Sequence, residues 1–319
     1  MTRTRSMTSQ KPSAPSSSFE VDILSLSSDS STGSMASLSV SSKKRASTSK
    51  QKDSKKPRPL VAGSLSQADM QRFWGIEQKH RYDIFKSRLI VPGRVVNLSQ
   101  LKDSLCPVSS YLKVQKLSLF FTLRGLELFE EVVRLFYANL CISPDSGELE
   151  NLVLGNRIFI NDLFFKDICG TKFSGVIPYM NGTWPDGFEV SLEGVKRVVA
   201  EPDSNISHFG ALSLCFENRL LAHIVATTLI PRKGSLSNIS TREVFVLYCL
   251  LRKYRINWAE WFKEYMWKSG EDTNASASLP YGLLISRILV DRLVDLSMFT
   301  PIVINATYDS RTFSTMGYV

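Results

Sequence analysis

The chain has 319 residues, of which 43% are hydrophobic, enough to bury the core of one or two domains. Its net charge of +9 is unevenly distributed, because residues 1–60 hold 11 Lys and Arg against 4 Asp and Glu, whereas the rest of the chain holds 28 against 26. The basic character therefore belongs to the N-terminal region, which argues against a folded core that grips nucleic acid through its overall charge.

Residues 1–65 form a Ser/Lys-rich segment, with 19 Ser in its first 60 residues and almost no aromatic residues. Such a segment cannot bury enough apolar surface to offset its conformational entropy, so it is predicted to be a disordered tail. Within it, the apolar stretch Val21–Leu24 is followed by serines and Asp29. This pattern is typical of segments that add a strand to a partner sheet, as SUMO-interacting segments do, and a chance apolar island is the alternative.

Two basic clusters follow in the same tail. Lys43, Lys44 and Arg45 are separated by a Ser/Thr-containing spacer from a second cluster formed by Lys55, Lys56 and Arg58. The spacing resembles a bipartite nuclear import signal, so a nuclear location is favoured over a cytoplasmic one. A solubilising linker that touches phosphates weakly is the alternative.

The predicted domain, residues 66–319, is mainly α with a minor β-hairpin element. Apolar spacing predicts a helix over 67–90 and another over 126–140, in which Glu130 and Arg134 pair on the exposed face. A hairpin is predicted over 153–160 with Gly155-Asn156 near its front, and a short strand over 188–190. A further helix is predicted over 208–228.

The C-terminal part carries clearer helix boundaries. Ser240 with Glu243, and Asn257 with Glu260, have the spacing at which a capping residue and a glutamate satisfy free backbone donors. They predict helices near 241–253 and 258–268. Pro280 at a first-turn position predicts a helix over 281–295.

Several segments, taken in order, are similar to one known family. They are Phe136–Leu140, Val153–Ile158, Leu229–Gly234, Ile256-Asn257 and Leu279–Leu284. Over about residues 70–318 the chain resembles the plant transposon protein family. The resemblance implies a remnant or passenger of a plant mobile element, and it assigns no catalytic residues. Thr312–Tyr318 still resembles family sequence where members commonly continue into a polar tail, which implies a shortened gene product.

Cysteine spacing and hydropathy indicate the cellular compartment in which the chain is expected. The five cysteines include no Cys-x-x-Cys pair, which argues against a disulfide framework or a zinc finger and indicates a reducing compartment. The longest apolar run, Leu220 to Ile230, is far shorter than a membrane span. The sequence therefore predicts a soluble intracellular protein with no membrane segment.

No residues form a recognisable catalytic, cofactor or metal motif. Asp162, Asp167, Asp186 and Glu189 are the carboxylates of the middle region, but nothing in their spacing indicates the two-metal chemistry of a transposase or nuclease. Lys233-Gly234-Ser235 lacks the Gly-rich turn that precedes the lysine of a phosphate loop. The three histidines, His80, His208 and His223, lie beside no nucleophile motif.

An aromatic stripe occurs within the helix predicted at 258–268. Trp258, Trp261, Phe262 and Tyr265 recur at helical spacing, and a core-facing helix is the favoured interpretation. The alternative is an exposed ridge that stacks on bases or docks a partner, with Arg252, Lys253 and Arg255 contacting phosphates.

These observations favour a non-enzymatic protein derived from a plant mobile element, associated with nucleic acid non-specifically through its tail or with protein partners. One alternative is a capsid-like protein whose helical core self-associates. Another is a divergent metal-dependent transposase or nuclease, for which Asp162 and Asp186 would be tested first.

Overall fold

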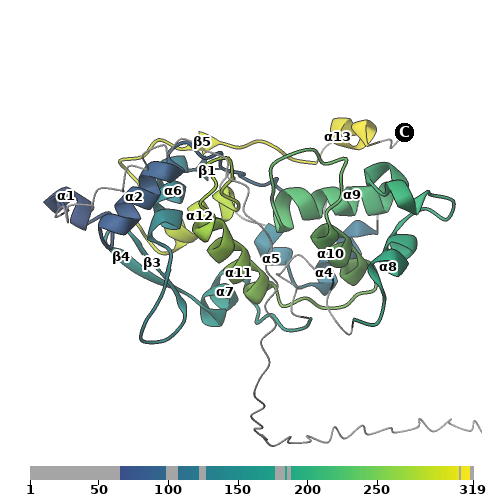
Figure 1. Ribbon diagram of the computed structural model, residues 1–319, viewed down its shortest axis with the longest axis horizontal. Helices are drawn as coiled ribbons and strands as arrows, with labels where there is room; N and C mark the ends of the chain where they lie inside the picture. The colour runs from purple at the N-terminus through teal and green to yellow at the C-terminus, as the bar shows by residue number, and fades with distance from the viewer. Residues whose placement is uncertain are drawn as a thin grey trace, which may run out of the picture. The chain divides into compact units, whose positions relative to one another are not determined.

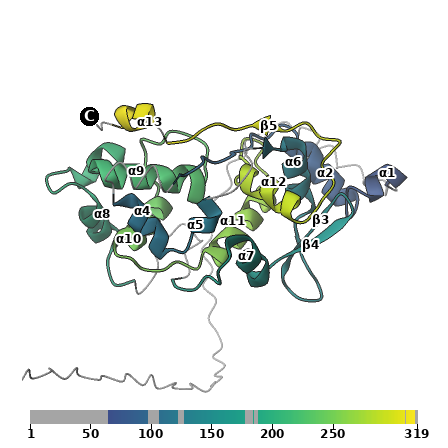
Figure 2. The same ribbon diagram turned by 180° about the vertical axis from the view of Figure 1, so that it is seen from behind.

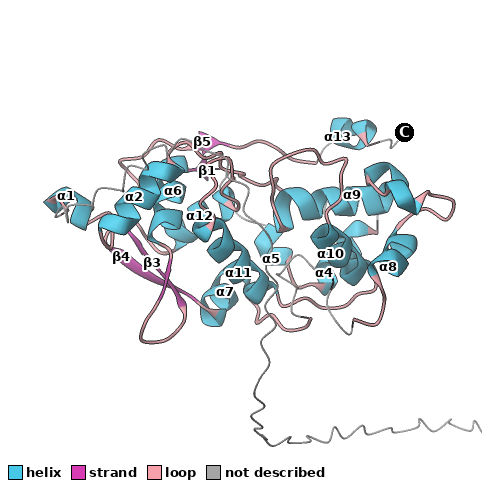
Figure 3. Cartoon of the chain, viewed as in Figure 1, coloured by secondary structure: helices cyan, strands magenta, loops and turns pink. Residues whose placement is uncertain are grey.

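Helices account for most of the ordered elements, and strands are short and few (Figures 1 and 3). The computed structural model describes residues 65–97, 107–121, 127–176, 184, 188–308 and 310–316. The mainly α class predicted from the sequence is confirmed. The sequence features predicted in the tail, Val21–Leu24 and the two basic clusters, lie outside the described residues, as do Asp186 and Cys106.

The helices follow one another along the chain with few long connections. They are α1 (Gln67–Met70), α2 (Ile76–Phe85), α4 (Val108–Val114), α5 (Ser118–Phe121), α6 (Glu130–Asn139), α7 (Asp162–Cys169), α8 (Leu192–Val199), α9 (Phe216–Ile224), α10 (Thr241–Leu251), α11 (Trp258–Glu271), α12 (Gly282–Asp291) and α13 (Ser310–Thr315). A π-helical turn, Val225–Leu229, extends α9. Short 3-10 turns occupy Ile206–His208 and Ala211–Ser213.

The larger sheet contains the predicted hairpin. β3 (Leu149–Val153) pairs antiparallel with β4 (Asn156–Ile160), and β2 (Cys141–Ile142) pairs with the other edge of β3. Leu154 and Gly155 connect β3 and β4 with φ of 49° and 81°, the positive values that a two-residue hairpin turn requires. The hairpin is therefore confirmed, although its first strand begins earlier than predicted.

A second sheet joins two distant segments. β1 (Glu127–Leu128) pairs antiparallel with β5 (Ile302–Val303). The helix predicted over 126–140 therefore begins only at Glu130, because the preceding residues pair with the C-terminal segment. The predicted ion pair on this helix is confirmed, with 3.0 Å between Arg134 Nη2 and Glu130 Oε2.

Local capping explains where the best-predicted helices begin. In α10 the Ser240 hydroxyl accepts from the Glu243 amide at 3.3 Å, and the Glu243 carboxylate accepts from the Ser240 amide at 2.5 Å. This reciprocal arrangement confirms the predicted capping box and the helix start. In α11 the Asn257 side chain accepts from the Glu260 amide at 3.5 Å, and the helix runs to Glu271, three residues beyond the prediction.

Other boundaries differ from the predictions. The helix predicted over 67–90 is divided into α1 and α2, because Phe73 is buried and Gly75 is extended with φ of −168°. α12 begins after Tyr281, whose φ is 57°, so Pro280 lies ahead of the helix rather than in its first turn. The helix predicted from 208 starts at Phe216.

The strand predicted over 188–190 is wrong. The residues in that stretch form no strand, and Phe188 instead packs its ring against Trp184 at 5.6 Å and against Phe245 at 5.2 Å. The apolar residues there therefore reflect the packing of the Phe188 ring against the core, and their backbone does not pair with another strand.

The core gathers around α11. This helix lies between α7 and the start of α12, as both views show (Figures 1 and 2). Phe262 packs against Phe120 at 5.1 Å, Phe165 at 5.6 Å and Tyr281 at 5.4 Å between ring centroids. One helix face thus joins α5, α7 and the start of α12 in a single apolar cluster.

Candidate functional site

The segments that carry the family resemblance contact one another in the core. The Tyr137 hydroxyl of the first segment donates to the Pro280 carbonyl of the last segment at 2.9 Å. The Tyr281 hydroxyl donates to the Leu229 carbonyl of the third segment at 2.7 Å. Burial raises the pKa of both tyrosines well above their ordinary value, so both stay neutral donors. These segments therefore hold the fold together.

Asn139 of the first segment is a buried polar link. Its amide nitrogen donates to the Arg72 carbonyl at 2.6 Å and to the Leu152 carbonyl at 2.7 Å, and its amide oxygen accepts from the Trp74 amide at 3.4 Å. One side chain thus ties the end of α6 to the break before α2 and to β3. Because three backbone groups depend on this buried side chain, its role is structural.

The aromatic stripe of α11 faces the core. Trp258, Trp261 and Phe262 are fully buried, and Tyr265 is partly buried with its hydroxyl donating to the Pro231 carbonyl at 3.2 Å. The favoured core-facing interpretation is confirmed. The alternative of an exposed aromatic ridge is wrong, because no ring of these three is accessible to a base or a partner.

The carboxylates considered for metal chemistry are dispersed. Asp162 pairs with Lys263, Asp167 lies 3.4 Å from Arg292, and Glu189 accepts from the hydroxyls of Tyr248 and Tyr254. Within the described part of the chain, no three His, Cys, Asp or Glu side chains gather in a way that would hold a metal ion. The described carboxylates thus provide no geometry for two-metal catalysis.

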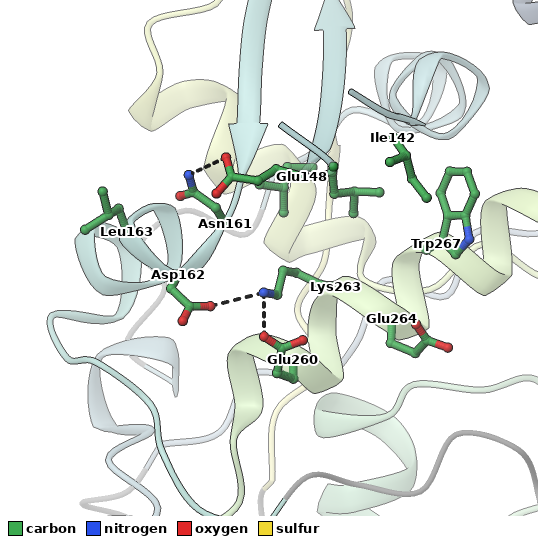
Figure 4. A pocket seen from close by; sticks show the side chains of 12 residues that line it. Ile142, Glu148, Asn161, Asp162, Leu163, Glu260, Lys263, Glu264 and Trp267 are labelled. Carbon is green, nitrogen blue, oxygen red and sulfur yellow. Dashed lines mark hydrogen bonds and ion pairs between the residues drawn. The ribbon is translucent and has the colours of Figure 1, made fainter. Parts of the chain in front are cut away.

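One hollow on the described surface is a pocket of about 460 Å³ (Figure 4). The end of β4, the start of α7 and one side of α11 form it, together with the turn before β3. Its lining residues are Ile142, Gly147, Glu148, Leu149, Ile160, Asn161, Asp162, Leu163, Glu260, Lys263, Glu264 and Trp267. The sequence predictions singled out Asp162 and Glu260 among these residues, but not as neighbours.

Lys263 is the cation of this pocket. Its ammonium lies 2.6 Å from Glu260 and 3.1 Å from Asp162, so it bridges α11 and α7 (Figure 4). Burial opposes its charge, but the bonds to these two carboxylates outweigh burial and raise the pKa of Lys263. Lys263 is therefore a protonated crosslink and lacks the lowered pKa of a catalytic lysine.

The remaining pocket groups are also engaged. Glu148 accepts from the Asn161 amide at 3.0 Å, and Glu264 pairs with Lys268 at 3.0 Å. Trp267 forms an aromatic wall beside them (Figure 4). The pocket therefore presents paired, solvent-screened carboxylates beside an aromatic surface.

Cysteine thiols are poor nucleophiles in this fold. Burial raises the pKa of Cys169 and of Cys249 to about 12, and it also raises the pKa of Cys141 and Cys215. Cysteine catalysis needs a thiolate near neutral pH, and these four thiols stay protonated there.

His223 is the histidine that the fold encloses, whereas His80 and His208 are exposed. Its Nδ1 lies 2.9 Å from the Tyr308 hydroxyl, which also lies 2.8 Å from the Thr227 hydroxyl. Burial, aided by Arg94, lowers the pKa of His223 from 6.5 to about 4. It is therefore neutral at physiological pH and acts as a hydrogen-bonding side chain of the core boundary.

The lowered pKa of His223 predicts acid sensitivity. Between pH 6.5 and 4 the unfolded chain binds a proton that the folded chain excludes, so the free energy of unfolding falls as the pH drops through this window. We expect His223→Asn to remove about 2 kcal/mol of this pH dependence, measured by urea unfolding at several pH values. His208→Asn is the matched control, and equal pH profiles for both variants would contradict the assignment.

Comparisons with protein-family models, curated proteins and solved structures return no match. Among the described residues, no helix has the length and apolar character needed to cross a membrane. The site is therefore interpreted from its own geometry.

Proposed function

We propose that the chain is a non-enzymatic protein derived from a plant mobile element and that it associates with nucleic acid. The observation that carries the proposal is the charge distribution, which places 11 Lys and Arg against 4 Asp and Glu in residues 1–60. Lysines and arginines that neutralise phosphates release condensed counterions, which gives binding that is independent of base sequence and weakened by salt. The family origin rests on the five ordered segments.

Six tail side chains test this proposal in the full-length protein. Replacing Lys43, Lys44, Arg45, Lys55, Lys56 and Arg58 by Gln should reduce affinity for a labelled DNA duplex. It should also flatten the dependence of log Kd on log salt by up to about 5, roughly 0.9 per lost phosphate contact. Unchanged affinity and slope would refute a role for the tail. The same variant tests nuclear import, because its fluorescent fusion should leave the nucleus if these clusters are the import signal.

The segment Val21–Leu24 supplies a separate proposal. A β-branched apolar run beside serines and Asp29 suits strand addition to a SUMO-type partner. Titration of the full chain with SUMO, followed by NMR, should show chemical-shift changes on the strand edge of SUMO. Val21→Asp with Ile23→Asp should abolish them.

Capsid-like self-assembly is the second candidate, and exposed apolar side chains after α12 favour it. Leu293, Met298 and Val303 are 89%, 90% and 59% exposed. Side chains of this kind on one segment suit an interface between copies. A molar mass that rises with concentration in light scattering would favour assembly over a monomeric nucleic-acid-binding protein.

A further inference from the structure

Six exposed basic side chains lie on three segments that contact one another, and we term this set the basic loop patch. Lys113 and Lys116 lie at the end of α4, Lys172 follows α7, and Arg252, Lys253 and Arg255 lie in the turn between α10 and α11. All six side chains are exposed. The patch is separate from the acidic pocket of Figure 4, none of whose lining residues it includes.

A buried glutamine holds the first and third segments together. Gln115 donates from its amide nitrogen to the Tyr254 carbonyl at 2.7 Å. Its amide oxygen accepts from the Ile256 amide at 3.0 Å and from the Trp258 indole at 3.2 Å. Because Gln115 is itself buried and lies between Lys113 and Lys116, these two lysines are brought beside the turn that carries the other basic residues.

Backbone hydrogen bonds connect the second segment, which carries Lys172, to the turn between α10 and α11. The Val176 amide donates to the Arg255 carbonyl at 2.8 Å, and the Asn257 amide donates to the Val176 carbonyl at 3.0 Å. Gly175 has a φ of 136°, and a Cβ there would lie 2.0 Å from the Arg255 carbonyl oxygen. Only glycine permits this close approach, which places Lys172 near the α10–α11 turn.

The patch concentrates positive charge on an otherwise balanced domain. None of its six basic side chains forms an ion pair with another described residue, whereas basic residues elsewhere, such as Lys79 and Arg197, pair with carboxylates. Glu189 lies near the turn, where it accepts from the Tyr254 hydroxyl at 2.6 Å. Residues 61–319 carry 28 Lys and Arg against 26 Asp and Glu, so a cluster of this size is a local excess.

Two of the lysines occupy backbone conformations that favour glycine. Lys116 has a φ of 58° and Lys253 a φ of 60°. Lys253 follows the cap of α10 in a Schellman arrangement, in which the Tyr254 amide donates to the Cys249 carbonyl at 2.8 Å. A lysine at such a position is conformationally less favourable than a glycine. Side chains held in unfavourable backbone conformations are found preferentially at functional sites.

We propose that the basic loop patch binds the sugar–phosphate backbone of DNA. The inference rests on the proposed nucleic-acid association and extends it from the tail to the helical domain. Six exposed ammonium and guanidinium groups, none of which pairs with a carboxylate in the described part of the chain, suit phosphates, which they contact without reading the bases. The helical domain then has a local phosphate-binding site, although its net charge is close to zero.

The full-length variant Lys116→Gly/Lys253→Gly/Arg255→Gln tests the patch. Its two glycines remove charge and relieve positive φ at the same time, so its melting temperature should equal or exceed that of the wild type. Its affinity for a labelled DNA duplex should fall about tenfold or more, and the salt slope should decrease by roughly 2.7, about 0.9 per contact. A structural role for these residues predicts the opposite combination, a lower melting temperature with unchanged binding.

A matched control removes the same charge elsewhere. Lys86→Gln/Arg197→Gln/Lys233→Gln changes three exposed basic residues that lie outside the patch. This variant should bind DNA with nearly the affinity and salt slope of the wild type. If the control and the patch variant bind equally well, the proposal is overturned.

The tail variant separates this inference from the proposed function. Binding that is lost on tail neutralisation but unchanged in the patch variant would overturn the patch and leave the proposed function standing. A wild-type chain that binds no DNA would overturn both. A patch variant that retains DNA binding but loses binding to phosphatidylserine vesicles would assign the patch to a membrane surface and would also overturn the proposal.

Discussion

Trp261→Ala should lower the free energy of unfolding by about 4 kcal/mol, because it empties a large, fully buried volume. Trp261 packs beside Trp258 on α11, with 6.2 Å between ring centroids. The cavity would lie at the centre of the core, where neighbouring rings cannot collapse fully. Urea unfolding of the full-length variant gives the value.

Trp267→Ala is the matched control for this prediction. It makes the same change on the same helix, but Trp267 lines the surface pocket and is only partly buried. We expect a loss of about 1 kcal/mol for this variant. A Trp261→Ala protein with wild-type stability and weakened DNA binding would contradict the buried position of the stripe and restore the exposed ridge.

Asn139→Ala should cost about 2 kcal/mol, because it removes the partner of two part-buried carbonyls and one amide. The Arg72 and Leu152 carbonyls would each lose a hydrogen bond from a protein donor. The break between α1 and α2 should loosen as well, since the Trp74 amide loses its acceptor. Hydrogen exchange of the Trp74 amide, measured beside urea unfolding, would detect this local effect.

Asn156→Ala provides the comparison for a surface asparagine. Asn156 is exposed at the start of β4 and donates only to turn carbonyls. Its replacement should cost about 0.5 kcal/mol. Equal losses for the two variants would show that the Asn139 link contributes no more than an ordinary turn contact.

The elements that could be predicted are those set by local chemistry. The capping box of Ser240 and Glu243 defines the start of α10 within a few residues of sequence. Likewise, the hairpin predicted with Gly155-Asn156 near its front forms, with its turn one residue earlier at Leu154-Gly155. In such cases neighbouring residues satisfy the backbone, so the sequence window contains the whole cause.

The elements that could not be predicted depend on distant partners. The helix predicted over 67–90 is broken where the Trp74 amide bonds to Asn139, 65 residues away in sequence. The helix predicted from 126 loses its first turn, because Glu127 and Leu128 form β1 and pair with β5 near the C-terminus. Helical periodicity contains no information about these contacts, so tertiary structure overrides it.

The candidate sites were even less accessible to sequence reasoning. The pocket depends on the contact between Lys263 and Asp162, which are 101 residues apart. In the basic loop patch, Arg252, Lys253 and Arg255 are neighbours in sequence, so the sequence predicts this part of the cluster. Lys113, Lys116 and Lys172 join them only through Gln115 and the backbone of Val176. The nearly balanced charge of residues 61–319 hides such a cluster.

The segments on which the proposed family resemblance rests have a structural role in the core. Tyr137, Asn139 and Tyr281 place hydrogen bonds between segments that are far apart in sequence. A resemblance that depends on such residues reflects the need to satisfy buried polar groups in a core. It therefore informs the fold, while function has to be sought in the tail and on the surface.

Lysine acetylation of the wild-type chain, with and without bound DNA and read by mass spectrometry, tests nucleic-acid association by tail and patch most directly. We predict protection of Lys43, Lys44, Lys55 and Lys56 in the tail and of Lys113, Lys116, Lys172 and Lys253 in the patch. Lys86 and Lys233 should react equally in both states. Uniform reactivity of all lysines, or protection confined to Lys86 and Lys233, would contradict the proposed mode of binding.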